Sequence, residues 1–365
     1  MRYMLAGGGT GGHIYPALTI AKALLEADQR AELLYVGTAT GREATLVPRA
    51  SIPFVTISSG GVINLSLGQK IKGGLKALRG LFEALGHIRR FAPDVVIGTG
   101  GFVSGPVLLA AKLAGRPIAI QEQNAFPGVT NRIASRWARV VFVPYAEARP
   151  HFPAGVNLST VGNPVRREVV EATRDDGRRA FGYGPGDRVL LVMGGSGGAR
   201  DFNRAVVAAV KRLSGEIRRL KVLHVAGERY ESQVRQAYGE LAGVTVVPYL
   251  HNMPEAYAAA DAGVFRAGAL TLAELQVRGL PSVLVPSPNV THNHQEWNAR
   301  TLEQRGAALV VREAEQMEEP LTKALRSVLT DAARSGAMKQ ALRDLAQPVA
   351  ARAIAEAIIQ IAERR

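Results

Sequence analysis

The sequence contains no cysteine and few aromatic residues, and each shortage excludes a kind of site. Without cysteine, the chain forms neither disulfides nor thiolate metal sites, which suits a reducing compartment. Aromatic residues make up 6% of the chain, and no stretch interleaves them with basic residues as single-strand nucleic-acid binders do. We therefore expect no nucleic-acid partner; a basic nucleic-acid-binding protein is a remote alternative.

Long apolar runs and acidic residues are also scarce. The longest apolar candidate, FVSGPVLLAAKLAG, is interrupted by Pro106 and Lys112, and no run approaches the roughly 18 residues that span a bilayer. The N-terminus, MRYMLAGGG, resembles a strand entering a loop rather than a signal peptide. The chain has 45 Lys and Arg against 31 Asp and Glu, a net charge of +14. This excess predicts polyanionic partners, such as nucleotides or an anionic lipid surface.

Apolar runs typical of strands alternate with helical patterns from end to end, which predicts an α/β architecture with parallel sheets. The order strand, glycine loop, helix occurs twice, in YMLAGGGTGGHIYPAL and LLVMGGSGGARDFNRAV. We predict two doubly wound Rossmann-like domains facing across a cleft, residues 1–162 and 163–346, with a turn at Gly162–Pro164 between them. A C-terminal helix within 347–365 can pack back on the first domain.

The two glycine loops, Gly7–Gly12 and Gly194–Gly198, allow a ligand to approach the backbone and direct N–H groups toward an anion. Neither has the Lys-Ser/Thr pair of an ATP phosphate loop. The strand ELLYVG ends without the acid that a dinucleotide site places on a ribose. His13 follows the first loop at a helix N-terminus, where the dipole favours the neutral ring. A neutral histidine there is a candidate general base; alternatively, it only hydrogen-bonds the loop.

Seven motifs then occur in one order: GGGTGGHIYPAL, GTGGFVSGP, QEQNAFPGVTNR, VGNPVR, GGSGGAR, RAGALTLAEL and HQEWNA. Together they resemble the MurG family of GT-B glycosyltransferases over nearly the whole chain. The resemblance implies inverting transfer of GlcNAc from UDP-GlcNAc to the C4 hydroxyl of undecaprenyl-pyrophosphoryl-MurNAc-pentapeptide (lipid I to lipid II) in peptidoglycan synthesis. It implies no cofactor and no bound metal. A UDP-GlcNAc 2-epimerase of the same fold is the alternative.

The resemblance also implies roles for single residues. His13 and Glu122 are rivals for the general base, and we favour His13. A loop of Gly100, Gly101 and Ser104 is expected to hold the acceptor diphosphate, and Glu274 is expected to accept the ribose hydroxyls. The full set of implied substrate-binding residues is Thr10, Gly11, Gly12, Asn124, Arg166, Ser196, Leu250, Ala269, Leu270, Thr271, Leu272, Ala273, Glu274, Gln295 and Asn298.

The segment 65–90 combines basic and apolar residues in a helical pattern. Six of the residues from Lys70 to Arg90 are Lys or Arg and one, Glu83, is acidic; Leu75, Leu78, Phe82 and Leu85 recur at helical spacing. Such a helix can lie on an anionic bilayer with its apolar face inserted, or it can bury its leucines in the domain. With a lipid-linked acceptor, we expect peripheral attachment to the cytoplasmic face of the cell membrane.

Overall fold

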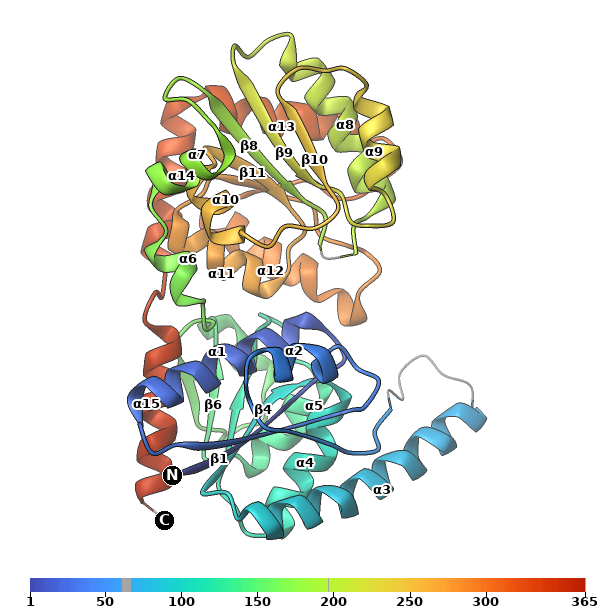
Figure 1. Cartoon of the computed structure of the whole chain (residues 1–365), viewed down its shortest axis with the longest axis vertical. Helices are drawn as coiled ribbons and strands as arrows, with labels where there is room; N and C mark the ends of the chain where they lie inside the picture. The colour runs from blue at the N-terminus through green and yellow to red at the C-terminus, as the bar shows by residue number, and fades with distance from the viewer. Residues whose placement is uncertain (61–66, 196, 365) are drawn as a thin grey trace. The chain divides into compact units, whose positions relative to one another are not determined.

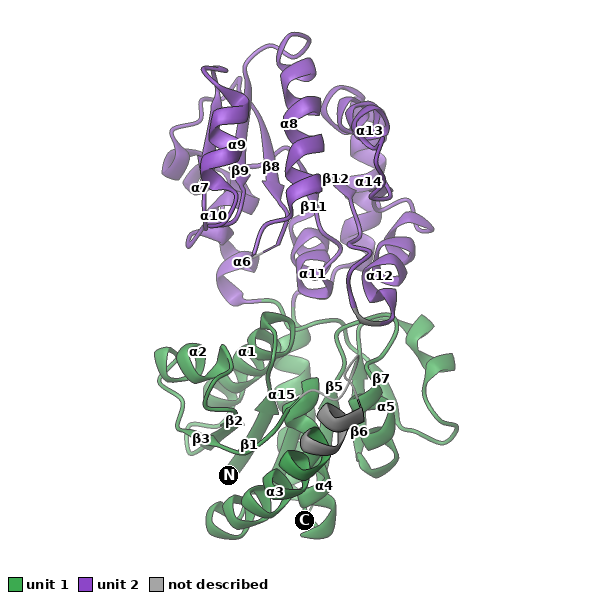
Figure 2. Cartoon of the chain, turned by 90° about the vertical axis from the view of Figure 1, so that its right-hand side faces the viewer, with its two compact units in different colours: residues 1–165, 349–365 green, residues 166–348 purple. Residues whose placement is uncertain are grey.

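The computed structural model of the chain describes residues 1–60, 67–195 and 197–364. The chain forms two compact units (Figure 2), one of Met1–Val165 with Val349–Arg365 and one of Arg166–Pro348. Each unit contains one fully parallel sheet. The prediction of two doubly wound Rossmann-like domains is therefore confirmed.

The first unit has a seven-stranded sheet in the order β3-β2-β1-β4-β5-β6-β7. The strands are β1 (Arg2–Gly7), β2 (Glu32–Gly37), β3 (Phe54–Thr56), β4 (Val95–Gly100), β5 (Ile118–Gln121), β6 (Val140–Val143) and β7 (Leu158–Thr160). From β1 the chain builds outward in one direction through β2 and β3, then returns to β4 and builds in the other. The order therefore reverses between β1 and β4, where ligands of such sheets bind beyond the carboxyl ends of the strands.

Helices cover both faces of this sheet. They are α1 (Gly11–Ala27), α2 (Glu43–Arg49), α3 (Leu67–Phe91), α4 (Gly101–Leu113), α5 (Val129–Ala134) and α15 (Ala350–Glu363), with short 3₁₀ turns at Ser135–Trp137 and Ala146–His151. Because strand side chains alternate between faces, Tyr3 and Leu5 join the core under α1 and α15, whereas Met4 and Ala6 join the core under α3 and α4. Figure 1 shows α15 packed beside α1.

The second unit has a six-stranded sheet in the order β10-β9-β8-β11-β12-β13. Its strands are β8 (Arg188–Met193), β9 (Leu220–Val225), β10 (Val244–Val247), β11 (Ala262–Phe265), β12 (Ser282–Leu284) and β13 (Leu309–Val310). Its helices are α6 (Arg167–Glu171), α7 (Arg174–Phe181), α8 (Arg200–Ser214), α9 (Glu231–Tyr238), α10 (Met253–Ala259), α11 (Ala269–Arg278), α12 (His294–Glu303, after a 3₁₀ turn at Thr291–Asn293), α13 (Glu318–Thr330) and α14 (Ala332–Leu345). Here the order reverses between β8 and β11.

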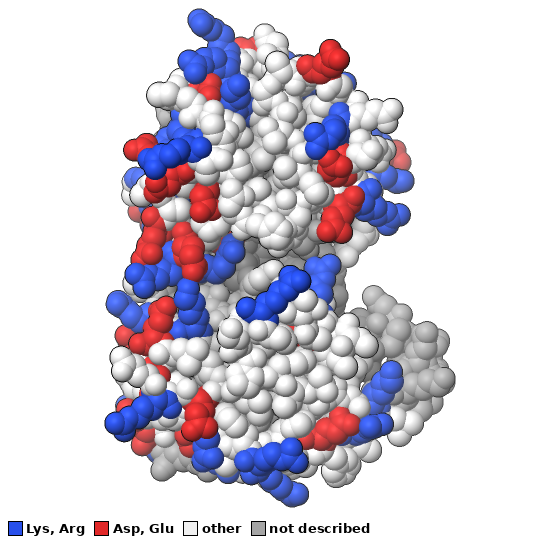
Figure 3. All heavy atoms as spheres, in the orientation of Figure 1, with Lys and Arg blue, Asp and Glu red and all other residues white. Residues whose placement is uncertain are grey.

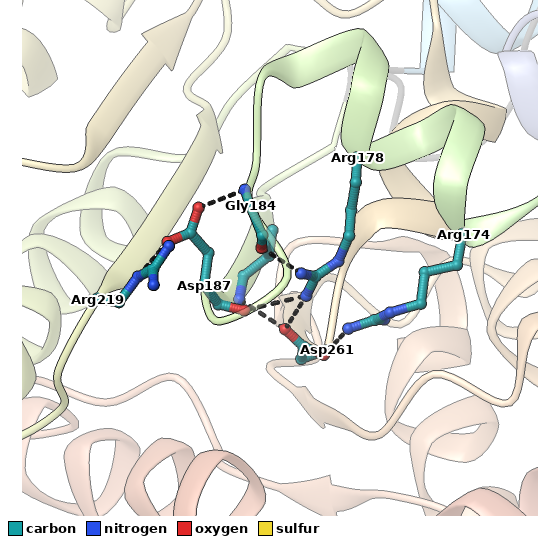
Figure 4. A network of polar contacts seen from close by, with 7 residues as sticks. Arg174, Arg178, Gly184, Asp187, Arg219 and Asp261 are labelled. Carbon is teal, nitrogen blue, oxygen red and sulfur yellow. Dashed lines mark hydrogen bonds and ion pairs between the residues drawn. The ribbon is translucent and has the colours of Figure 1, made fainter.

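A polar network holds the amino ends of these two central strands (Figure 4). The Asp261 carboxylate, just before β11, pairs with Arg174 and Arg178 of α7 and accepts a 2.8 Å hydrogen bond from Val189 N of β8. Asp187 accepts a 2.7 Å bond from Gly184 N and pairs with Arg219. The Gly184 amide and then the Arg219 guanidinium hold the pKa of Asp187 below its usual value. This network fixes the sheet at the end opposite the strand carboxyl ends.

One stretch of the described chain, Ala332–Glu363, is long and apolar enough to cross a membrane by length and composition alone. The structure divides it, because α14 ends at Leu345 and α15 begins at Ala350. Ile354, Ala355 and Ile358 of α15 are fully buried in the core of the first unit. This stretch therefore forms two separate helices rather than one continuous span.

Candidate active site

His13 lies where the strand order of the first unit reverses. It stands in the first turn of α1, directly after β1, and its ring rests against the backbone that follows β4. A Cβ added at Gly100 would lie 2.9 Å from His13 Nδ1, and one added at Gly101 would lie 3.2 Å from His13 Cδ2. Both glycines have positive φ, 104° and 81°, which favours glycine. Gly100 and Gly101 therefore leave room for the histidine ring. This explains why both positions are glycine, whether or not the loop also holds a diphosphate.

The structure corrects the interpretation of Ser104. Its side chain is fully buried, its hydroxyl lies 2.7 Å from Ala6 O and 2.8 Å from Gly100 O, and it accepts a hydrogen bond from Gly100 N. These three contacts use the hydrogen-bonding capacity of the hydroxyl, and through them Ser104 links β1 to the start of α4. Its side chain therefore points into the core, which the spacing in the sequence did not reveal.

The first glycine loop already contains an anionic group. The Glu43 carboxylate, at the start of α2, is fully buried and accepts bonds from Gly9 N at 3.2 Å, Thr38 N at 3.1 Å and Thr38 Oγ1 at 2.6 Å. A Cβ at Gly8 would collide with Glu43 at 2.7 Å. The loop therefore wraps the side chain of Glu43, which occupies the space beside Gly8 and Gly9. Thr10, Gly11 and Gly12 follow at the surface-facing start of α1.

Glu122, the rival base, lies directly after β5 and is only 1% exposed. One carboxylate oxygen accepts from Gln123 N, Asn124 N and Asn124 Nδ2 at 2.9–3.1 Å; the other accepts from Gly128 N and Asn131 Nδ2 at 3.0 and 2.8 Å. Such donors occupy the lone pairs of the carboxyl oxygens. Glu122 therefore organises the loop from Gln123 to Asn131, and Asn124 is part of that loop.

In the second unit, the start of α11 lies at the reversal between β8 and β11. The first helical bond runs from Leu272 N to Gly268 O at 3.0 Å, so the amides of Leu270 and Thr271 before it have no acceptor within the helix. No acidic residue stands in this first turn. The arrangement suits an anion. The side chains of Leu272 and Ala273 are buried in the core, so they contribute packing there.

Glu274, one turn further along α11, forms an ion pair with Arg166. Arg166 Nη2 lies 2.9 Å from Glu274 Oε1, and Arg166 precedes α6, to which α11 is also tied because Arg278 Nη1 donates to Ala172 O at 2.7 Å. Tyr257 lies beneath this pair: burial, then the Glu274 charge, raises the pKa of its hydroxyl well above the usual value. Arg166 and Glu274 therefore lie side by side in the second unit.

The first turn of α12 is tied to the ends of two neighbouring strands. Gln295 Oε1 accepts from Ser287 N at 2.9 Å, and the buried Asn298 donates from Nδ2 to Ala267 O at 3.2 Å. Both side chains lie three residues apart on one helix face. Leu250, buried beyond β10, lies in a loop at the same carboxyl edge of the sheet. Ser196 lies outside the described residues.

Three buried polar residues at these loops were missed by the sequence analysis: Glu43, Thr99 and Gln123. A polar residue inside an apolar strand run, such as Thr99 in DVVIGTG, is the signal that marks such positions. Within residues 1–60, 67–195 and 197–364, no group of three His, Asp or Glu side chains is placed to hold a metal ion.

The chain resembles glycosyltransferases of known sequence and structure. Residues 3–143 match the glycosyltransferase family 28 N-terminal domain, and residues 189–356 match the family 28 C-terminal domain. The UDP-N-acetylglucosamine--N-acetylmuramyl-(pentapeptide) pyrophosphoryl-undecaprenol N-acetylglucosamine transferase of Symbiobacterium thermophilum is 65% identical over 365 residues, covering 100% of this chain and 97% of that protein.

Among solved structures, MurG of Acinetobacter baumannii has a TM-score of 0.79 at 31% identity, covering 98% of this chain and 99% of its own. A UDP-GlcNAc 2-epimerase from Neisseria meningitidis has a TM-score of 0.68 at 13% identity, covering 99% of this chain and 100% of its own; this likeness shows the fold alone. The chain therefore belongs to glycosyltransferase family 28 and, within it, to the MurG family.

Proposed function

We propose that this chain transfers GlcNAc from UDP-GlcNAc to the C4 hydroxyl of undecaprenyl-pyrophosphoryl-MurNAc-pentapeptide, with inversion at the anomeric carbon, in peptidoglycan synthesis. The observation that carries the proposal is the 65% identity to a transferase of that name over the whole chain. The first unit takes the acceptor and supplies the base, and the second unit takes the donor nucleotide.

His13 is the general base of this proposal. The ring lies half-buried at the reversal point of the first sheet, whereas Glu122 is fully enclosed by five donors within its own loop. A base needs an exposed lone pair within reach of the substrate hydroxyl. Burial and hydrogen bonding therefore favour His13 over Glu122.

The reaction is a single displacement. His13 takes the proton of the C4 hydroxyl while that oxygen forms a bond to the anomeric carbon of GlcNAc. The bond from this carbon to the β-phosphate oxygen breaks, and UDP leaves with the electron pair. The charge that develops on the leaving diphosphate is stabilised by the first-turn amides of α11.

The remaining donor contacts come from side chains of the second unit. The Glu274 carboxylate accepts the ribose hydroxyls, with Arg166 holding it in place from 2.9 Å. The amides of Gln295 and Asn298 contact the sugar hydroxyls, since an amide both donates and accepts. The backbone at Leu250 contacts and recognises the uracil. In the first unit, Thr10, Gly11, Gly12 and Asn124 border the donor sugar and the acceptor.

The α3 helix attaches the first unit to the cytoplasmic face of the membrane. Leu75, Leu78 and Phe82 are 64%, 52% and 65% exposed, while Ala84 and Ile88 are buried in the core. Leu85, the fourth residue of the apolar stripe, packs against that core. Lys and Arg side chains lie along α3 in Figure 3. Each basic residue near an anionic surface adds about 1 kcal/mol.

Glu83, the acid of this helix, does not oppose attachment. Its carboxylate pairs with Arg79 at 2.8 Å and accepts from Ser58 N and Ser58 Oγ. Although partial burial acts against it, the Ser58 amide and Arg79 together lower the pKa of Glu83. The acid is therefore neutralised by a neighbouring guanidinium.

Vesicle sedimentation tests the attachment. With vesicles containing anionic lipid, changing Leu75, Leu78 and Phe82 to Gln together should release most of the protein from the pellet. Leu25, 45% exposed on α1, is the matched control, and Leu25→Gln should sediment like the unaltered protein. Equal sedimentation of the triple variant would refute attachment through α3.

A transfer assay tests the reaction. The purified protein is incubated with UDP-GlcNAc labelled in the sugar, with and without the lipid-linked MurNAc-pentapeptide. Label should enter the lipid fraction with one UDP released per sugar, and only when the acceptor is present. Conversion of UDP-GlcNAc to another sugar nucleotide without acceptor would instead identify a 2-epimerase.

A further inference from the structure

The ring of His13 is held at one nitrogen by two oxygen atoms. Nδ1 lies 3.0 Å from the backbone oxygen of Thr99 and 3.0 Å from Oε1 of Gln123. Thr99 is fully buried and Gln123 is 2% exposed. Thr99 lies near the end of β4, and Gln123 lies two residues after the end of β5, so both contacts come from buried residues at the carboxyl edge of the sheet.

The orientation of the Gln123 amide follows from its surroundings. Its nitrogen lies 2.8 Å from Thr99 O, 2.9 Å from Gln121 O and 2.5 Å from Gln121 Oε1. All three partners are oxygens, so the NH₂ group of Gln123 must face them and its carbonyl oxygen must face His13. The backbone is fixed as well, because Asn163 Nδ2 donates to Gln123 O at 2.9 Å.

Two acceptors at Nδ1 determine the tautomer of the ring. A carbonyl oxygen cannot donate a hydrogen bond, so Nδ1 must carry the proton to satisfy either partner. In the neutral ring the lone pair then lies on Nε2. When Nε2 takes a proton, the positive charge that forms is stabilised by the two oxygens already facing Nδ1.

Thr99 also holds the helix from which the ring projects. Its hydroxyl donates to His13 O at 2.7 Å, while its own carbonyl faces the ring of the same residue. The start of α1 and the ring are thus bound by one buried residue. Rotation of the ring would break both contacts of Nδ1.

We propose that Gln123 is a positioning residue that, together with the Thr99 carbonyl, fixes His13 in the Nδ1–H tautomer and directs its Nε2 lone pair to the reacting hydroxyl. The catalytic part of this statement rests on the proposed function, whereas the tautomer does not. Gln123 itself does not touch the substrate.

The test combines ring-nitrogen NMR with kinetics. In protein labelled with ¹⁵N at its seven histidines, the His13 signals are assigned by their loss in His13→Gln. The unaltered protein should show a protonated Nδ1 and an unprotonated Nε2. In Gln123→Met, which keeps the size but removes the acceptor, the Nε2–H form should become populated and kcat should fall about ten to a hundredfold, with an unchanged KM for UDP-GlcNAc.

Ser135→Ala is the control. Ser135 is as buried as Gln123 in the same unit, and its hydroxyl donates to Arg132 O at 2.7 Å, so the change removes a buried polar group that does not orient the Gln123 amide. It should leave the tautomer and kcat unaltered. If Gln123→Met does not fold, Gln123→Asn retracts the carbonyl by one methylene and should act in the same direction.

Two results would overturn the proposal: an Nε2–H tautomer in the unaltered protein, or the same tautomer and kcat in Gln123→Met. Full activity in His13→Gln would count against the proposed function only, because it would show that His13 is not the base. The NMR measurement would still decide how the His13 ring is held.

Discussion

His224 gives the second unit a stability that depends on pH. The side chain is fully buried on β9; Nδ1 lies 2.9 Å from the Tyr238 hydroxyl and Nε2 3.1 Å from Asn203 Oδ1. Asn203 Nδ2 donates to Ala226 O, so its oxygen faces the ring and Nε2 carries the proton. Burial lowers the pKa of His224 from 6.5 to about 3. The native state therefore keeps this ring neutral in mildly acidic solution.

The unfolded chain binds the proton first, because its histidine titrates near its usual value of about 6.5. Stability is thus fully present above that value and is lost as the pH falls toward 3. Between pH 7 and pH 5, the linkage relation gives a loss of about 2 kcal/mol from this one group. This loss of unfolding free energy depends little on the pKa of His224 in the folded state, since any pKa well below 5 keeps the native ring neutral at pH 5.

Urea unfolding at pH 7 and pH 5 measures this loss. In a Trp137→Phe background, the remaining tryptophan, Trp297, reports on the second unit. His224→Gln should be less stable at pH 7 but should lose about 2 kcal/mol less between the two pH values than the unaltered protein. The exposed His251 is the control, and His251→Gln should keep the full pH dependence. Equal losses in His224→Gln and the unaltered protein would refute the argument.

Three further substitutions separate stability from activity. Asp261→Asn should cost about 3 kcal/mol of unfolding free energy in urea unfolding while leaving the KM for UDP-GlcNAc unchanged. Glu274→Gln should weaken UDP-GlcNAc binding at least about tenfold by calorimetry, because a charge-assisted hydrogen bond is lost. Gly100→Ala adds a methyl group against the His13 ring at a φ of 104°; it should lower kcat at least about tenfold with UDP-GlcNAc binding intact. An unchanged urea unfolding curve for Asp261→Asn, an unchanged Kd for Glu274→Gln or an unchanged kcat for Gly100→Ala would contradict the respective expectation.

The sequence was sufficient for the elements on which the fold depends. Alternating apolar runs and glycine loops predicted both sheets, because strand burial and helix starts are local properties of the chain. The boundary expected after residue 162 lies close to the division that the structure places after Val165. The amphipathic pattern of α3 was visible too, but its register against α4 was not, so the sequence could not separate the leucines that pack on the core, such as Leu85, from those that stay exposed.

The contacts that define the site could not be predicted from the sequence in the same way. Ser104 has the spacing of a ligand-binding hydroxyl, yet its bond to Ala6 O joins residues 98 positions apart. The Glu43 bond to Gly9 N and the Gln123 bond to His13 also connect distant segments. Such pairs arise from sheet order, which one sequence does not reveal. The rivalry between His13 and Glu122 could therefore be weighed only with burial and hydrogen bonds at hand.

The most direct measurement of the central claim is the structure of the reaction product. NMR of the glycosylated acceptor, formed from UDP-GlcNAc with an α-configured anomeric carbon, reports both the linkage position and the anomeric configuration. The account predicts one GlcNAc joined in the β configuration to C4 of the muramyl sugar. An α-linked sugar, or attachment at another hydroxyl, would contradict direct displacement by the C4 oxygen with His13 as its base.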